Sequence, residues 1–251
     1  MTNILTGMMG AAGVATSDCP LPYPTTPGGT PILWFAGDDV TLSGTDVTQW
    51  NDKSSSGFDA TKLAASLNYA TLDATDSNFN GKPTLNFPGS SLYELSGETM
   101  GDIMTATEFE WWFVGMATFA GAYNYMFGDT SGYWWFGPQT SGLYKGGDQH
   151  VEVSLALSTP GMFQLGQGIG GTSNLILRGI DGAEDDYGSN VNYYSGSWLS
   201  HGIRIAGRGT TGASYPFRGD IAEIICYTSP LTGDALTQTK CYLAGKYDME
   251  W

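Results

Sequence analysis

Two groups of aromatic residues in this sequence have the chemistry to bind a sugar. Tyr133, Trp134 and Trp135 are consecutive within an aromatic run between glycines, and Tyr193 and Tyr194 are adjacent further on. Flat aromatic rings pack against the apolar faces of pyranose rings, while polar groups around them satisfy the hydroxyls. The same rings are also suited to a hydrophobic core or a subunit interface. The sequence leaves these alternatives open.

An acidic stretch between the two aromatic groups could bind calcium. It contains Asp181, Glu184, Asp185 and Asp186, and calcium takes several oxygen ligands. We name Asp181, Asp185 and Asp186 as candidate ligands. Their spacing does not match the EF-hand pattern, and a solvated charged turn is the preferred interpretation of the stretch. We therefore expect no required cofactor, with Ca²⁺ as the one cation to test.

The net charge excludes several kinds of partner. The chain of 251 residues carries a formal charge of −15, with 25 acidic and 10 basic side chains. A nucleic-acid binder needs a basic face to displace counterions from phosphates, and an anionic membrane would repel this chain. We expect neither partner. The same charge would repel polyanionic glycans unless a cation intervened.

Three cysteines, Cys19, Cys226 and Cys241, are too few and too scattered for a disulfide scaffold or a zinc site. Cys226 lies on a predicted strand and Cys241 on a predicted helix, and the two could come close. Two buried thiols in a reducing compartment are the simpler interpretation. Whether Cys226 and Cys241 pair remains open.

Residues 1–30 differ in composition from the rest of the chain. Ile4, Leu5, Met8 and Met9 form a small apolar cluster, and a proline-rich stretch follows. No Lys or Arg precedes Lys53, so a signal peptide with a basic first region is not assigned. We expect an extended tail that anchors the chain to other subunits or to copies of itself, as in a homo-oligomer.

Residues 31–251 have the pattern of one all-β domain. Short apolar runs with alternating character, separated by Gly, Ser, Thr and Asn, predict about a dozen strands, while residues 59–78 are expected to be mostly irregular. The segment 218–227 predicts a buried strand. After Leu231 the apolar period changes to three and four residues, with Thr232 as N-cap, which predicts a short C-terminal helix.

Two segments carry a resemblance to a known family. Residues 217–227, followed by Leu-Thr and a helix ending in Tyr-Leu-Ala-Gly-Lys-Tyr, resemble the C-terminal signature of LamG-like jelly-roll domains of the concanavalin A-like lectin/glucanase superfamily. Residues 33–39, 47–54 and 80–87 resemble its N-terminal signature. The resemblance spans 31–251 and implies two antiparallel sheets packed as a jelly-roll sandwich. It does not specify activity, since the superfamily includes lectins, glycosidases, lyases and inert modules.

The resemblance also provides a test for catalysis. Glucanases of this superfamily carry Glu, Asp and Glu on one strand, at spacings of two and three residues. The closest match here is Glu108-Phe-Glu110, with Trp112 and Phe113 where further carboxylates should stand. We therefore expect no glycosidase activity and assign no catalytic residues.

The combined features favour a structural or adhesive role. We expect a non-enzymatic subunit of a bacteriophage particle, such as a capsid decoration or tail-fibre protein. It would be assembled in the host cytoplasm and displayed on the virion surface, with a lectin-like domain that binds host or environmental glycans. The alternative is an extracellular carbohydrate-active enzyme or carbohydrate-binding module of the same superfamily, and a purely structural subunit is a third possibility.

Overall fold

We analysed the protein in a computed structural model. The structure describes residues 19, 21–64, 67–105, 107–118, 124–131, 135–138, 143–146, 151–154, 158–169, 175–179, 184–187, 199–208 and 215–249. No helix in these ranges is long and apolar enough to cross a membrane.

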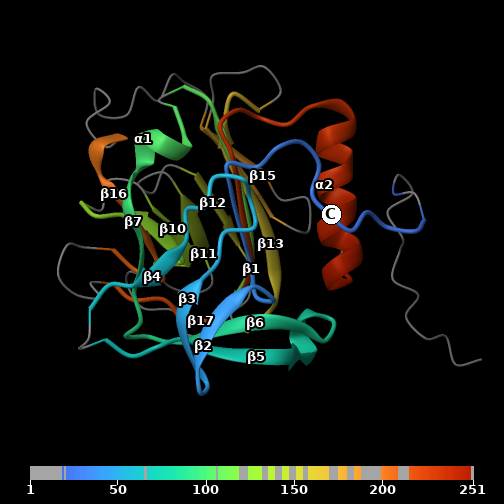
Figure 1. The fold of residues 1–251 in the computed structure, drawn as a ribbon. Helices are drawn as coiled ribbons and strands as arrows, with labels where there is room; N and C mark the ends of the chain where they lie inside the picture. The colour runs from blue at the N-terminus through green and yellow to red at the C-terminus, as the bar shows by residue number, and fades with distance from the viewer. Residues whose placement is uncertain are drawn as a thin grey trace, which may run out of the picture.

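The strands of the described ranges join in one curled, 17-stranded antiparallel sheet (Figure 1). Their bounds are β1 Leu33–Ala36, β2 Val40–Ser43, β3 Asp46–Trp50, β4 Ala60–Lys62, β5 Thr71–Asp76, β6 Lys82–Pro88, β7 Tyr93–Thr99, β8 Phe109–Ala117, β9 Phe127–Asp129, β10 Trp135–Pro138, β11 Leu143–Gly146, β12 Val151–Ser154, β13 Gly161–Gln167, β14 Leu175–Gly179, β15 Glu184–Tyr187, β16 Gly202–Ile205 and β17 Arg218–Tyr227. The short helices are η1 Ser77–Phe79 and α1 Met100–Ile103, and the C-terminal helix is α2 Gly233–Tyr247.

The sheet folds over so that two runs of strands share one core. One run is β5-β6-β17-β8-β13-β14-β15, with β1 also paired to β17, and the other is β3-β4-β7-β16-β9-β10-β11-β12. Between them Phe113 stacks on Phe136 at 4.4 Å, and Trp111 meets Phe127 at 4.2 Å between ring centroids. An all-β antiparallel fold with a C-terminal helix is thus confirmed. The connected sheet does not establish the finer assignment to a jelly roll.

The central strands β8 and β17 are buried on both faces. Every residue of β8 is buried, with Trp111 and Phe113 in the inner core and Trp112 and Val114 in a second cluster beneath α2. A strand covered on both sides has a nearly continuous apolar sequence. Helix α2 provides the outer cover in Figure 1 and begins after the predicted N-cap, Thr232.

A bulge in β17 brings a carboxylate under this helix. Ile221 pairs with Gly115, but Glu223 pairs with Val114, so two residues of β17 oppose one of β8 at this point. Ala222 joins the outer apolar cluster, and Glu223 bonds to side chains of α2. The extra residue therefore places two consecutive side chains on the outer face.

Two segments predicted to lack strands contain them. Residues 59–78 hold β4, β5 and η1, and β5 is mostly exposed, so its sequence has little of the apolar alternation that marks a strand. Its backbone pairs with β6 regardless of side chains. Glu184, Asp185 and Asp186 lie in β15, which pairs with β14, so this part of the acidic stretch is a strand and not a turn.

Residues 21–30 fold back on the domain instead of extending from it. The Gly28 N–H donates to Thr239 Oγ1 at 2.9 Å, and Tyr227 Oη donates to the Gly28 carbonyl at 2.9 Å. A Cβ at Gly28 would stand 2.2 Å from the Ala235 carbonyl oxygen, so this close approach to α2 requires glycine. We call residues 21–30 the N-terminal strap.

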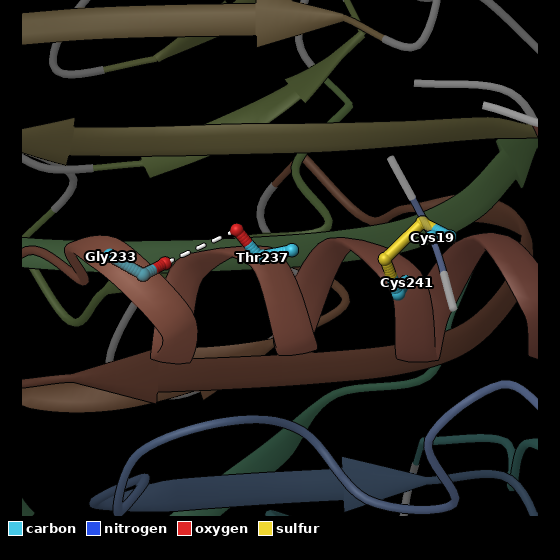
Figure 2. Close-up of a disulfide and its surroundings, with 4 residues drawn as sticks. All are labelled: Cys19, Gly233, Thr237 and Cys241. Atoms are coloured by element: carbon cyan, nitrogen blue, oxygen red, sulfur yellow. Dashed lines mark hydrogen bonds between the residues drawn. A yellow bond between two sulfur atoms is a disulfide. The ribbon is translucent and has the colours of Figure 1, made fainter. Parts of the chain in front are cut away.

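A disulfide fixes the strap to α2. Cys19 and Cys241 are bonded, with their Cα atoms 5.4 Å apart, and Figure 2 shows the bond on the helix, one turn beyond Thr237. Cys226 and Cys241, whose pairing the sequence left open, are therefore not bonded to each other, and the expectation of two buried thiols is wrong for Cys241. Cys226 faces the inner core from β17 while Cys241 lies on the outer helix, so the sheet separates them.

Candidate functional site

A pocket of about 260 Å³ opens where the strap, the β1 end of the sheet and α2 meet. It combines aromatic rings with charged side chains. Its lining residues are Tyr23, Pro24, Thr25, Trp34, Asp38, Lys53, Lys82, Tyr242, Gly245 and Lys246.

Trp34 reaches the pocket because of strand alternation in β1. Leu33 and Phe35 point into the inner core, so Trp34 faces outward and is half-buried against the helix. Its ring meets Tyr242 edge to face at 6.0 Å, and its Nε1–H donates to Glu223 Oε1 at 2.5 Å. Both rings are thereby held in a fixed orientation.

Glu223 anchors the pocket side of the helix. Its carboxylate is fully buried and also accepts hydrogen bonds from Tyr242 Oη at 2.7 Å, Lys246 Nζ at 2.9 Å and Tyr247 Oη at 2.6 Å. Burial, together with the negative charge of Glu223, raises the pKa of Tyr242 and of Tyr247. Both hydroxyls therefore remain protonated donors at neutral pH.

Lys53 and Asp38 form the outer rim. Lys53 Nζ lies 2.9 Å from Asp38 Oδ1 and 5.0 Å from the centre of the Trp34 ring. The turn that carries Lys53 is held by Asp52, whose carboxylate accepts from the backbone N–H groups of Trp34 and Phe58, each at 2.9 Å. A half-buried turn carboxylate thus positions the rim lysine.

Tyr23 completes the wall from the strap. A Cβ at Gly245 would stand 2.2 Å from Tyr23 Cγ, so the ring packs directly on the helix backbone. The side chain is half-buried and lines the pocket together with Pro24 and Thr25. Because the Cys19–Cys241 bond fixes the same segment, this wall depends on the disulfide.

Among the residues predicted to bind a sugar, the structure describes only Trp135. Trp135 lies in β10, is 1% exposed and packs on Tyr125 at 4.3 Å, an interior position that offers no ring face to a sugar. Among the side chains that the structure describes, no cluster of acidic, histidine or cysteine residues could bind a metal. The side chains of Asp185 and Asp186 lie outside that description. The remaining candidates outside the described residues are Tyr133, Trp134, Tyr193, Tyr194, Asp181, Ile4, Leu5, Met8 and Met9.

Glu110, the nearest match to a catalytic carboxylate, has a structural position. It is fully buried and accepts from Trp112 Nε1 at 2.6 Å, Gln164 Nε2 at 2.9 Å and the Leu231 N–H at 2.7 Å. Burial raises its pKa, an effect that these hydrogen bonds and Arg178 only partly offset. The carboxylate links β8 to the segment leading into α2.

The sequence did not single out the pocket. Trp34 stands in a fully apolar run, Leu33 to Phe35, and its outward direction is visible only as alternation within that run. Tyr242 and Lys246 are four residues apart on a predicted helix, a spacing that places both on one face. That spacing was a usable signal for part of the site. No sequence signal indicated that the strap would contribute to the pocket.

Solved structures share this fold. Domain 4 of an extracellular family GH43 arabinanase from Geobacillus stearothermophilus, in complex with arabinotriose, matches with a TM-score of 0.55 at 10% identity over 86% of this chain and 99% of its own. A GH54 α-L-arabinofuranosidase matches at 0.56 and 16% identity over 90% of this chain, which spans 62% of that protein. A Trypanosoma rangeli sialidase mutant matches at 0.54 and 12%, over 84% of this chain and 32% of the sialidase.

No family model matches the sequence, and no curated protein does. At 10 to 16% identity the structural matches establish the fold alone. They fit a β-sandwich, as the LamG-like resemblance implied, without assigning the chain to that family.

These matches correct the expectation of a non-enzymatic protein. The structures that share the fold are glycoside hydrolases or a domain of one, namely an arabinanase, an arabinofuranosidase and a sialidase. The exclusion of enzymes from the Glu108–Glu110 pattern alone therefore does not stand. A bacteriophage or virion role has no support among them.

Proposed function

We propose that this chain is a carbohydrate-binding domain of an extracellular carbohydrate-active protein, and that its ligand binds in the pocket between the strap, β1 and α2. The observation that carries the proposal is the pairing of Trp34, Tyr23 and Tyr242 with charged hydrogen-bonding groups in one pocket. Apolar rings with polar groups at their margin match a sugar, which has apolar faces and a hydroxyl edge.

The size and rigidity of the pocket support a small saccharide. Its volume of about 260 Å³ lies just below the range of about 300–1,000 Å³ for drug-sized ligands, which suits one or two sugar residues. Glu223 fixes the Trp34 and Tyr242 side chains before a ligand arrives, so little conformational entropy is lost on binding.

The matched structures and the disulfide give further support. One matched domain is in complex with arabinotriose, and an arabinofuranosidase of the same fold is complexed with arabinofuranosyl-α-1,2-xylobiose. Disulfides persist in oxidising compartments, so the Cys19–Cys241 bond favours an extracellular location.

Titration calorimetry with a panel of oligosaccharides tests this proposal. The panel contains arabinotriose, arabinofuranosyl-xylobiose and neutral and acidic oligosaccharides, and reducing-sugar release is recorded on the corresponding polysaccharides. We expect binding that weakens about tenfold in Tyr23→Ala, the loss of one stacking ring. Tyr69→Ala, which removes a half-buried tyrosine on another part of the surface, is the matched control. Binding that is absent, or equal in both variants, would reject the pocket.

A further inference from the structure

Lysines are concentrated at the pocket in a chain dominated by acids. The sequence has ten basic residues against 25 acidic ones, yet Lys53, Lys82 and Lys246 all line this one pocket. They come from a turn, from the start of β6 and from the last turn of α2. Only the tertiary fold brings them together.

Two of these charges are already balanced. Lys246 Nζ lies 2.9 Å from Glu223 Oε2, and Lys53 Nζ lies 2.9 Å from Asp38 Oδ1. Within the described residues Lys82 has no carboxylate at ion-pair distance, and its side chain is half-buried. The pocket with its Glu223 base therefore carries an excess of one positive charge.

The pKa of Asp38 reflects the two paired lysines, Lys53 and Lys246. Its partial burial alone would raise its pKa, but the hydrogen bond from Lys53 and the positive charges of Lys246 and Lys53 outweigh burial and lower the pKa. Lys53, Lys82 and Lys246 give the pocket a local positive charge, although the protein as a whole is strongly negative. At physiological ionic strength charges beyond about 8 Å are largely screened, so the nearby lysines dominate for a bound ligand.

We propose that the pocket selects a saccharide with one anionic group, a carboxylate or a sulfate ester, which binds at Lys82 while the sugar ring contacts Trp34 and Tyr23. This inference rests on the proposed carbohydrate-binding function and specifies its ligand class. The lysines supply the cations that the overall charge otherwise lacks for an acidic glycan. The Asp38 carboxylate and the anionic group of the ligand would compete for the same lysine charges. Removing the charge of Asp38 should therefore increase the affinity for an anionic ligand.

The test is calorimetry at low and physiological salt with matched ligands. Trigalacturonate, its fully methyl-esterified form and a sulfated galactan trisaccharide separate carboxylate, neutral and sulfate chemistry. We expect the wild type to bind at least one anionic ligand about three- to tenfold more tightly than the methyl ester, as for a partly exposed ion pair. The preference should shrink as salt rises.

Three variants assign the effect to its residues. Lys82→Gln should remove the preference for the anionic ligand, so that the ratio of the affinities for the anionic and the methyl-esterified ligand falls to about one. Asp38→Asn should increase anionic affinity, because a competing carboxylate is lost. Lys62→Gln is the matched control, since Lys62 lies over Tyr69, outside the pocket lining. Circular dichroism confirms that each variant is folded.

The outcomes separate this inference from the proposed function. Equal affinity for anionic and methyl-esterified ligands, with binding still weakened by Tyr23→Ala, overturns the anionic selectivity and keeps carbohydrate binding. A preference that survives Lys82→Gln also overturns the inference, since residues other than Lys82 would then bind the anionic group. The absence of binding to every saccharide rejects both proposals. Selectivity lost in Lys82→Gln and enhanced in Asp38→Asn supports the inference.

Discussion

The two faces of the central strands β8 and β17 are both buried, but they are held by different forces. The inner face presents rings such as Trp111 and Phe113 to the facing strands, and its contacts are aromatic and aliphatic. The outer face carries the buried carboxylates Glu110 and Glu223, each of which accepts several hydrogen bonds, including bonds from other segments. Apolar contacts are not directional, while hydrogen bonds to a carboxylate are.

The inner face therefore mainly stabilises the fold, while the outer face determines where α2 is placed. The inner face can exchange one apolar shape for another at modest cost, provided the volume is kept. The outer face fixes where α2 and its side chains lie, because Glu223 needs Trp34, Tyr242, Tyr247 and Lys246 at hydrogen-bond distance. The pocket forms on the face whose geometry is specified by directional bonds.

The largest loss of stability is expected on the inner face. Phe113→Ala should lower the free energy of unfolding by about 3–5 kcal/mol, because it removes a ring stacked between Trp111 and Phe136 and leaves a cavity. Urea denaturation measures the change. Phe113→Leu, which keeps much of the volume, is the control. A loss below about 1 kcal/mol would contradict an inner face that carries the stability.

Breaking the hydrogen-bond network around Glu223 should affect saccharide binding as well as stability. Glu223→Ala should cost about 3 kcal/mol, because Lys246 and the two tyrosines lose their buried acceptor. It should also abolish saccharide binding, which Phe113→Leu should leave intact. Urea denaturation and calorimetry report both quantities. Retained affinity in a folded Glu223→Ala protein would show that the network does not position the pocket.

Removing the Cys19–Cys241 disulfide tests whether the strap supports the pocket on the outer face. Replacing Cys19 and Cys241 with serine should cost about 2–4 kcal/mol, since the bond closes a loop across 222 positions. We expect the affinity for saccharide to fall with it, because Tyr23 is no longer held on α2. Cys226→Ser, at the free buried thiol, is the control for cysteine removal itself. If the double variant binds the saccharide with the affinity of the wild type, the pocket does not depend on the disulfide that holds the strap.

The smallest effect concerns the pH dependence of stability. Burial raises the pKa of Glu110 above its ordinary value of 4.5, so the folded protein binds this proton more tightly than the unfolded chain. Stability from this group is therefore lost as the pH rises from 4.5 through the raised pKa. Glu110→Gln should remove that slope in urea midpoints measured across the window. An unchanged slope would contradict the role of burial.

The strands were predictable where their side chains carry the signal. The strand at 218–227 and the helix after Thr232 both follow from apolar spacing, and the structure has them at these positions. Trp50, in the segment that resembles the N-terminal signature, is buried in the core, with its Nε1–H donating to the Ala36 carbonyl at 2.8 Å. By contrast β5 is held by backbone pairing along an exposed edge, which leaves little pattern in the sequence.

Local sequence patterns could not predict the candidate site. The sugar-binding prediction rested on consecutive aromatic residues, but Trp135 is enclosed in the core, while Trp34 was hidden in an apolar run. Which face of a buried strand a ring occupies depends on the layer that covers it. Here that layer is α2, whose position cannot be inferred from the run around Trp34.

The sequence by itself determined the all-β class, the C-terminal helix and the acidic character of the protein, because periodicity and charge are properties of neighbouring residues. The tertiary structure alone decided that Cys19 bonds to Cys241 and that Lys53, Lys82 and Lys246 surround one pocket. These groups are separated by up to 222 positions along the chain. Their meeting depends on how the sheet curls and on where the β17 bulge places Glu223, which no local pattern encodes.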